Sequence, residues 1–291
     1  MKKALGIDVG GTKVYCAVIN EKGEILSEVE KYHTPKTFDE IRNLFKSIIE
    51  KHEKNVDVIA FSTCGAVNKT NDRILGSTGN IAKEYPTMDF KNLSNKKVFV
   101  ENDANCAAWA EYLIGSSKNM PYSIMITLGT GVGGGIILGG KLYKGKSGAA
   151  GEMHFKMRTD KHRKCTCGSW DCFEAYASGT GLKKTAEELS KNSEITTYDV
   201  IEHIDNPMMK KIFDTWQNDI LEGIIGLANI FDPDVVVLSG SMAEFVDIEY
   251  LEKEANLQIV TQPFKVVKAS AGNYSGMIGA ALLGLGVKDI G

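Results

Sequence analysis

The sequence predicts an α/β protein built of two similar lobes. Its 291 residues reach the size at which one hydrophobic core stops growing, roughly 250–300 residues. A unit of strand, glycine turn and strand occurs twice, because Gly11-Thr12 of the first turn recurs 118 residues later as Gly129-Thr130 of the second. Helical patterns alternate with short buried β-patterns around both hairpins. We therefore expect two α/β lobes related by duplication, with their glycine turns facing one another across a cleft.

The elements of the first lobe are predicted from hydrophobic spacing. Apolar residues at intervals of three and four between Phe38 and Ile49 predict an amphipathic helix over 38–53. An Ala-rich run after Asn102 and Asp103 predicts a second helix, which ends near Leu113. Short runs rich in β-branched and aromatic residues predict strands at 4–8, 14–19, 25–30, 56–62 and 98–101.

The second half of the chain repeats this pattern. Strands are expected at 123–128 and 133–138, the second of them ending in a Gly139-Gly140 hairpin turn, and the stretch 180–230 is expected to be mostly helical. A short buried strand at 235–238 comes after a Pro-containing break. The Ala/Gly-rich run 276–285 predicts a closely packed helix that returns to the first lobe. The expected domains are 1–115 with about 276–291, and 116–275.

Composition excludes several classes of protein. With 34 Lys plus Arg against 37 Asp plus Glu, the formal charge of -3 lacks the basic excess of a nucleic-acid binder. No uncharged apolar run approaches the 18 or so residues of a membrane span. We expect a cytoplasmic protein with neither a nucleic-acid nor a membrane partner. In such a compartment, the six cysteines are expected to be thiols or metal ligands.

The first glycine turn has the chemistry of a phosphate site. Gly10 and Gly11 let backbone N–H groups approach phosphate oxygens, Thr12 adds a hydroxyl donor, and Lys13 adds a positive charge. Asp8 has the ligand type that holds a hydrated Mg²⁺. A plain hairpin turn explains the two glycines equally well, but it requires neither the flanking acid nor the Thr-Lys pair. We favour the phosphate interpretation.

The second turn, at 128–135, is richer still in glycine. Five of the seven residues from Gly129 to Gly135 are glycines, a cost in chain entropy that packing alone does not explain. The run lacks the Lys-Ser/Thr ending of a Walker P-loop, and the sequence continues as a strand rather than a helix. It is therefore predicted to be a second phosphate-binding hairpin.

The segment Glu101-Asn102-Asp103-Ala104-Asn105 lies where a strand gives way to a helix. A carboxylate at a helix N-terminus stays ionised and can accept a proton from an alcohol. Capping is the ordinary role of Asn and Asp at this place. Because only one of Asn102 and Asp103 can be the cap, the other is available for a ligand.

Three cysteines gather at 165–172. The spacing of Cys165, Cys167 and Cys172 is typical of a zinc site, which needs a fourth ligand, and His154 and His162 are candidates. A loop with three unpaired thiols is the alternative.

Together these motifs resemble those of the ROK family of bacterial sugar kinases, sugar-responsive repressors and related proteins. The resemblance covers nearly the whole chain. It implies a two-lobed actin/hexokinase-like (ribonuclease H-like) fold that closes over a sugar and ATP. The matching segments are Asp8–Lys13, Glu101–Asn105, Leu128–Gly135, Gly151-Glu152 and Cys165–Glu174.

The resemblance also implies roles for single residues. Asp103 would be the general base that takes the proton of the sugar 6-hydroxyl as it attacks the γ-phosphate of ATP. Asn80, Asn102, Glu152 and Glu174 would bind the sugar, with His154 as a further candidate. The phosphates, with Mg²⁺, would be positioned by Asp8, Gly10, Gly11, Thr12, Lys13, Thr130 and Gly131, and Gly240 would lie near the adenosine.

The chain departs from the family pattern at the cysteines. The family has Gly-His where this chain has His154-Phe155, and its histidine both ligates zinc and touches the sugar. Asp171 replaces a family glycine. Because phenylalanine cannot ligate and a shift of one residue changes the direction of a side chain, we expect no occupied family-type zinc site.

The substrate is predicted only by resemblance. The runs 107–111 and 276–285 are most similar to those of bacterial N-acetylmannosamine kinases, which predicts N-acetylmannosamine as the acceptor and a role in sialic acid catabolism. Glucokinase, β-glucoside kinase and fructokinase are alternatives, and a catalytically silent sugar sensor is the alternative outside enzymes. A repressor is not expected, since Asp8 stands so early in the chain. We expect a homodimer.

Overall fold

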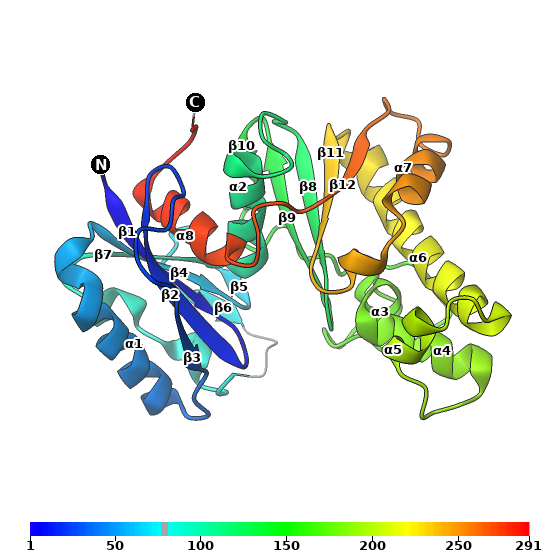
Figure 1. Ribbon diagram of the computed structural model, residues 1–291, viewed down its shortest axis with the longest axis horizontal. Helices are drawn as coiled ribbons and strands as arrows, with labels where there is room; N and C mark the ends of the chain where they lie inside the picture. Colours follow the sequence, from blue (N-terminus) through cyan, green and yellow to red (C-terminus); the bar gives the residue numbers. More distant parts are fainter. Residues whose placement is uncertain (77–80, 291) are drawn as a thin grey trace. The chain divides into compact units, whose positions relative to one another are not determined.

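The computed structural model describes residues 1–76 and 81–290, and contacts divide the chain into two compact units (Figure 1). The first unit comprises Met1–Pro121, Gly135–Gly151 and Ser270–Gly291, and the second comprises Tyr122–Gly134 and Glu152–Ala269. The domain boundaries expected from the sequence, 1–115 with about 276–291 and 116–275, stay a prediction.

The first unit is built on a five-stranded sheet of order β3-β2-β1-β4-β7. β1 pairs antiparallel with β2 and parallel with β4, which in turn pairs parallel with β7. Parallel strands end at the same edge, so the carboxyl ends of β1, β4 and β7 lie together. The strands are β1 (Lys3–Val9), β2 (Lys13–Asn20), β3 (Glu30–His33), β4 (Val58–Thr63) and β7 (Lys97–Asn102).

Helices cover both faces of this sheet (Figure 1). α1 (Phe38–His52) buries Ile41, Phe45 and Ile48 against one face, together with the buried side chains of β1 and β4. α2 (Asp103–Ile114) and α8 (Ser275–Leu285) pack on the other face, where Trp109 and Ile278 belong to one apolar cluster. The predicted helices 38–53, 102–113 and 276–285 are therefore confirmed to within a residue or two.

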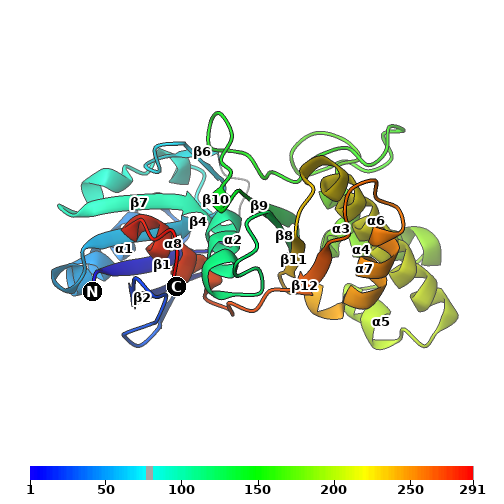
Figure 2. The same cartoon turned by 90° about the horizontal axis from the view of Figure 1, so that it is seen from above.

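The second five-stranded sheet has the order β10-β9-β8-β11-β12, and β10 with the end of β9 falls in the residue range of the first unit. In the second unit, the helices that come after the cysteine segment contact one another, with α3 and α4 against α6 (Figure 2). The strands are β8 (Ser123–Leu128), β9 (Val132–Leu138), β10 (Lys141–Leu142), β11 (Val235–Ser239) and β12 (Lys265–Lys268). The helices are α3 (Glu174–Ala177), α4 (Gly179–Ser190), α5 (Thr197–Glu202), α6 (Pro207–Phe231) and α7 (Ile248–Asn256).

The two sheets repeat one topology. In each, the first strand along the chain lies in the middle, the next two strands lie on one side, and two parallel strands lie on the other. The order 3-2-1-4-5 occurs in both when the strands of each sheet are numbered along the chain. The duplication inferred from the two glycine turns is thus borne out at the level of topology.

One predicted strand was misplaced. The run 25–30 does not form the third strand, since Ile25 makes only an isolated bridge to Ile19, and β3 begins at Glu30 instead. The alternation of the sequence at 25–30 resembles a strand, but Ser27 uses its hydroxyl to accept the N–H of Val18 and thereby replaces a regular ladder bond. Within residues 1–76 and 81–290, no helix combines the length and apolar character needed to cross a bilayer.

Candidate active site

The first glycine turn joins β1 to β2. The N–H of Gly10 donates to the carbonyl of Lys13 at 2.9 Å, and the hydroxyl of Thr34 donates to the carbonyl of Gly10 at 2.6 Å, so the turn is fixed from two sides. The side chains of Thr12 and Lys13 are exposed. An exposed hydroxyl and ammonium on a fixed turn can meet a phosphate without rearrangement of the backbone.

Asp8, at the end of β1, contacts Ser62, a residue that was not predicted from the sequence. The hydroxyl of Ser62, at the end of β4, donates to Asp8 Oδ1 at 2.6 Å. Burial raises the pKa of Asp8, and the Ser62 hydrogen bond opposes that rise. Ser62 could have been found from the sequence, because parallel strands β1 and β4 end at the same edge.

The second glycine turn is anchored on a helix N-terminus. The N–H of Gly179, the first residue of α4, donates to the carbonyl of Gly129 at 2.8 Å, and the Thr180 hydroxyl donates to the carbonyl of Thr130 at 2.7 Å. The turn therefore lies beside the positive end of a 12-residue helix, a favourable position for phosphate oxygens. Thr130 and Gly131 of the predicted set are both in this turn.

Gly240 occupies a position that only glycine fits comfortably. Its φ is +88°, and a Cβ there would lie 2.4 Å from the carbonyl oxygen of Leu128, at the end of β8. The loop after β11 therefore runs directly against the strand that leads into the second glycine turn. The structure brings Gly240 and that turn to the same region of the second unit.

Asn102 and Asp103 have different roles at the junction of β7 and α2. Asn102 is the N-cap of α2, since its Oδ1 accepts the N–H of Asn105 at 3.1 Å, and its Nδ2 donates to the carbonyl of Gly65 at 3.2 Å. Asp103 is the first residue of the helix, and its side chain is exposed, with Oδ1 accepting the N–H of Ala104 at 2.8 Å. Asp103 is thus the carboxylate that the N-terminus of α2 presents to solvent.

Glu174 is the first residue of α3 and lies against the second glycine turn. Its Oε2 accepts the N–H of Val132 at 3.1 Å, and its Oε1 accepts the hydroxyl of Thr166. A Cβ on Gly131 would lie 2.6 Å from Glu174 Oε2, so the absence of a side chain at Gly131 makes room for this carboxylate. Glu152 is exposed and lies 3.7 Å from the ring of His154. Asn80 lies outside the described residues.

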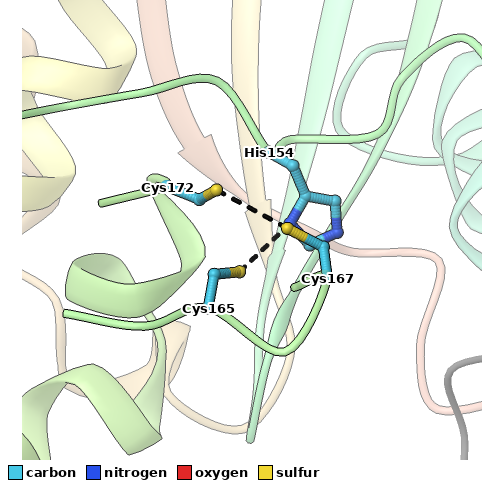
Figure 3. A group of neighbouring side chains, drawn as sticks. All are labelled: His154, Cys165, Cys167 and Cys172. Carbon is cyan, nitrogen blue, oxygen red and sulfur yellow. Dashed lines mark hydrogen bonds between the residues drawn. The ribbon is translucent and has the colours of Figure 1, made fainter. Parts of the chain in front are cut away.

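The three cysteines and His154 together form a group of four candidate metal ligands (Figure 3). The ligand atoms of His154, Cys165, Cys167 and Cys172 all lie within 4.8 Å of one another. Burial raises the pKa of Cys165 to about 12 and also raises that of Cys172. Burial opposes ionisation of Cys167 too, but hydrogen bonds from the Ser169 N–H and the two other thiols lower its pKa.

Two separations among these four atoms match those of a zinc site. His154 Nδ1 lies 3.6 Å from Cys165 Sγ, and the sulfurs of Cys167 and Cys172 are also 3.6 Å apart (Figure 3). Tetrahedral zinc with Zn–S bonds of about 2.3 Å requires separations of roughly 3.5–3.8 Å between ligand atoms. His154 therefore lies among the cysteines despite the shift of one residue, which removes the geometric reason for expecting an unoccupied site.

Two local features explain how His154 reaches the cysteines although it lies one residue before the family's histidine position. The N–H of His154 donates to the carbonyl of Glu152 at 2.9 Å, a tight turn centred on Met153 that redirects the chain. Phe155, which stands at the family's histidine position, instead stacks on Phe173, with ring centroids 5.0 Å apart and an interplanar angle of 13°. His154 thus lies with the cysteines while Phe155 packs against Phe173.

Asp171 adopts a backbone conformation that glycine favours. Its φ is +57°, in the left-handed region that asparagine and aspartate tolerate better than most residues. Its carboxylate accepts the N–H of Arg163 at 2.8 Å and the hydroxyl of Tyr176 at 2.8 Å. Burial opposes ionisation, but these hydrogen bonds dominate and lower the pKa of Asp171. The second candidate histidine, His162, does not join the cysteines and lies 3.2 Å from Glu188.

A cavity of about 530 Å³ lies elsewhere in the second unit, and none of the predicted site residues lines it. Its walls combine aromatic and amide side chains from α6, α7 and the short helix Ala243–Phe245, three residues after Gly240. The lining residues are Ile204, Lys210, Phe213, Asp214, Gln217, Asn218, Phe245, Asp247 and Tyr250.

The duplicated sheet topology, with a glycine turn after the first strand of each sheet, is that of the two-unit α/β fold of hexokinase-like sugar kinases. The chain belongs to the ROK family, whose family model matches residues 4–286.

Known sugar kinases align with this sequence over almost the whole chain. A glucokinase of Streptomyces coelicolor is 32% identical, with 97% of each chain covered. An N-acetylmannosamine kinase of Vibrio cholerae is also 32% identical, over 96% of this chain and 98% of its own. The crystal structure of a ROK family glucokinase from Streptomyces griseus in complex with glucose and AMPPNP has a TM-score of 0.80 and 30% identity, covering 98% of this chain and 99% of that one.

Proposed function

We propose that this protein is an ATP-dependent kinase that phosphorylates the 6-hydroxyl of a hexose or N-acetylhexosamine. The observation that carries the proposal is the start of α2, where Asn102 caps the helix and Asp103 exposes its carboxylate. A carboxylate held ionised by a helix N-terminus is suited to take the proton of an attacking alcohol. Asp103 is the proposed general base.

Phosphoryl transfer needs alignment and charge neutralisation more than covalent chemistry. In the proposed mechanism, the turn of Gly10, Gly11, Thr12 and Lys13 and the turn of Thr130 and Gly131 bind the phosphates of ATP. Gly240 lies by the adenosine. When Mg²⁺ is bound, it neutralises developing charge on the phosphates, and Asp8 would hold it through its water shell.

For the sugar, we propose that Asn80, Asn102, Glu152, His154 and Glu174 bind the hydroxyls that do not react. N-acetylmannosamine is the proposed acceptor, supported by the similarity of the runs 107–111 and 276–285 to bacterial N-acetylmannosamine kinases. Glucose, a β-glucoside or fructose is the alternative, since the glucokinase and the N-acetylmannosamine kinase named above are equally identical to this chain. A silent sugar sensor would not require both phosphate turns. We propose a cytoplasmic homodimer.

The acceptor is tested by an assay that couples ADP release to NADH oxidation. We expect ATP turnover with N-acetylmannosamine to have a kcat/KM at least tenfold above that with glucose, N-acetylglucosamine, fructose or cellobiose. The Asp103→Asn protein serves as the blank for contaminating kinases. If glucose equals or exceeds N-acetylmannosamine, the proposed acceptor is wrong, although the protein would still be a sugar kinase. If no sugar supports ADP release, the proposed kinase activity is disproved.

We further infer that His154, Cys165, Cys167 and Cys172 hold one structural zinc ion, because their spacing fits tetrahedral coordination. Zinc would stabilise the loop before α3 by tying its ends together. We expect about one zinc per chain by elemental analysis of protein purified without chelator, and about 0.2 or less for Cys172→Ser. Cys64→Ser, which changes a cysteine outside the cluster, should retain the metal. A wild-type zinc content near zero would refute this inference.

A further inference from the structure

A buried carboxylate lies two residues before Asp103. Glu101, near the end of β7, is only 1% exposed, and a buried carboxylate is stable only if donors and a positive charge surround it. Glu101 carries no role in the proposed reaction. The elements that surround it are all in the first unit.

Three segments of the chain send donors to this one carboxylate. Oε1 accepts the N–H of Asn102 at 2.9 Å and Nδ2 of Asn105 at 3.1 Å, both at the start of α2. Oε2 accepts Nδ2 of Asn71, in the turn between β5 (Ala66–Val67) and β6 (Ile74–Gly76), at 2.7 Å. Oε2 also pairs with Nζ of Lys144, after β10, at 2.6 Å. Each oxygen of the carboxylate therefore has two partners.

Lys144 binds the same turn that contributes Asn71. Its side chain is 14% exposed, and Nζ also donates to the carbonyl of Asn68 at 3.2 Å. Asn71, with φ of +58°, accepts the N–H of Val100 with its carbonyl at 3.0 Å and donates through Nδ2 to the carbonyl of Val100 at 2.7 Å. Lys144, this turn and the end of β7 thus form one connected hydrogen-bonded unit.

The network ends on the backbone that precedes the proposed base. The bond from the Asn102 N–H to Glu101 fixes the peptide between them, and Asn102 is also held by its cap bond to Asn105 and by Gly65. Asp103 comes directly after Asn102. A displacement of about 1 Å at a reacting group can cost on the order of 10²-fold in rate.

We propose that Glu101 and Lys144 form a positioning pair that fixes the Asn102-Asp103 turn for proton transfer, a role that rests on the kinase activity proposed above. Glu101 orients the turn through hydrogen bonds, and Lys144 places a positive charge 2.6 Å from its buried carboxylate. A purely structural ion pair would contribute to stability without changing turnover in folded protein. The two roles are therefore separable by experiment.

The test compares Lys144→Met, Lys144→Arg and Glu101→Gln with wild type, measuring kcat, both KM values and the melting temperature. We expect kcat to fall about 10- to 100-fold in Lys144→Met and Glu101→Gln, while KM for sugar and for ATP changes less than about threefold. Lys144→Arg, which keeps the charge, should recover most of the loss. The matched control is Lys146→Met, because Lys146 is exposed and its side chain makes no hydrogen bond or ion pair with the described residues.

The outcomes distinguish this proposal from the one on which it rests. If wild type has no kinase activity with any sugar, the proposed function fails first. If wild type is active and Lys144→Met keeps kcat within twofold while its melting temperature falls, the pair is structural and the positioning role is overturned. If Lys144→Met does not fold, Asn71→Ala removes one donor without a change of charge, and it must lower kcat at least threefold at temperatures where it is folded.

Discussion

Replacing Asp103 by Asn is expected to lower kcat for sugar phosphorylation by about 10²–10⁴-fold, the range typical of losing a general base. Asparagine has the same shape as aspartate, so it preserves the start of α2, where the neighbouring Asn102 and not Asp103 is the cap. An amide cannot take the proton of the sugar hydroxyl at neutral pH. The loss should therefore appear in turnover with little change in fold or in sugar binding.

Three measurements make this prediction specific. Steady-state kinetics give kcat, calorimetric titration gives sugar affinity, and circular dichroism gives the melting temperature. Asp39→Asn is the matched control, because Asp39 is also an exposed acid in the first turn of a helix, α1. Turnover by Asp103→Asn within tenfold of wild type would eliminate Asp103 as the base.

The second large effect concerns stability. Gly279 lies where α8 crosses α2, and a Cβ on it would lie 1.8 Å from the carbonyl oxygen of Cys106. In most helices, exchange of Gly for Ala stabilises by about 1 kcal/mol. Here the added methyl must push two helix backbones apart, so we expect Gly279→Ala to lower the free energy of unfolding by about 2–4 kcal/mol.

The comparison is Gly226→Ala in α6, where a Cβ would meet nothing within 4 Å. That variant should be as stable as wild type or more stable by up to about 1 kcal/mol. Urea unfolding measured by tryptophan fluorescence reports both values. Equal stability of the two variants would contradict the close packing of α8 against α2 at Gly279.

The hairpins and long helices could be predicted from the sequence because each depends on local chemistry. Glycine turns between β-rich runs predict β1–β2 and β8–β9, and the small residues of 276–285 predict a helix that packs at close range. The mistaken strand at 25–30 shows the limit of this approach. A run can have β-composition and still be excluded from the ladder when a side chain, here Ser27, takes the partner's hydrogen bond.

The site was predictable in part. The adjacency of Asn102 and Asp103 showed that one would cap the helix, but sequence could not say which, because this depends on backbone angles at the end of β7. His154 was harder to predict. Counting positions placed it one residue away from its family's ligand, and only the tight turn at Met153 brings it to the cysteines. A turn of this kind compensates for a shift of one residue, and the local sequence does not reveal it.

The position of Glu174 has a thermodynamic consequence. Its carboxylate accepts the N–H of Val132 in the second glycine turn, and the proposed function also assigns it to the sugar. A ligand that reorients this carboxylate on one side must alter the turn on the other. By linkage, such coupling is reciprocal. The proposed kinase should therefore bind ATP with an affinity that depends on whether sugar is present, and bind sugar with an affinity changed by the same factor when the nucleotide is bound.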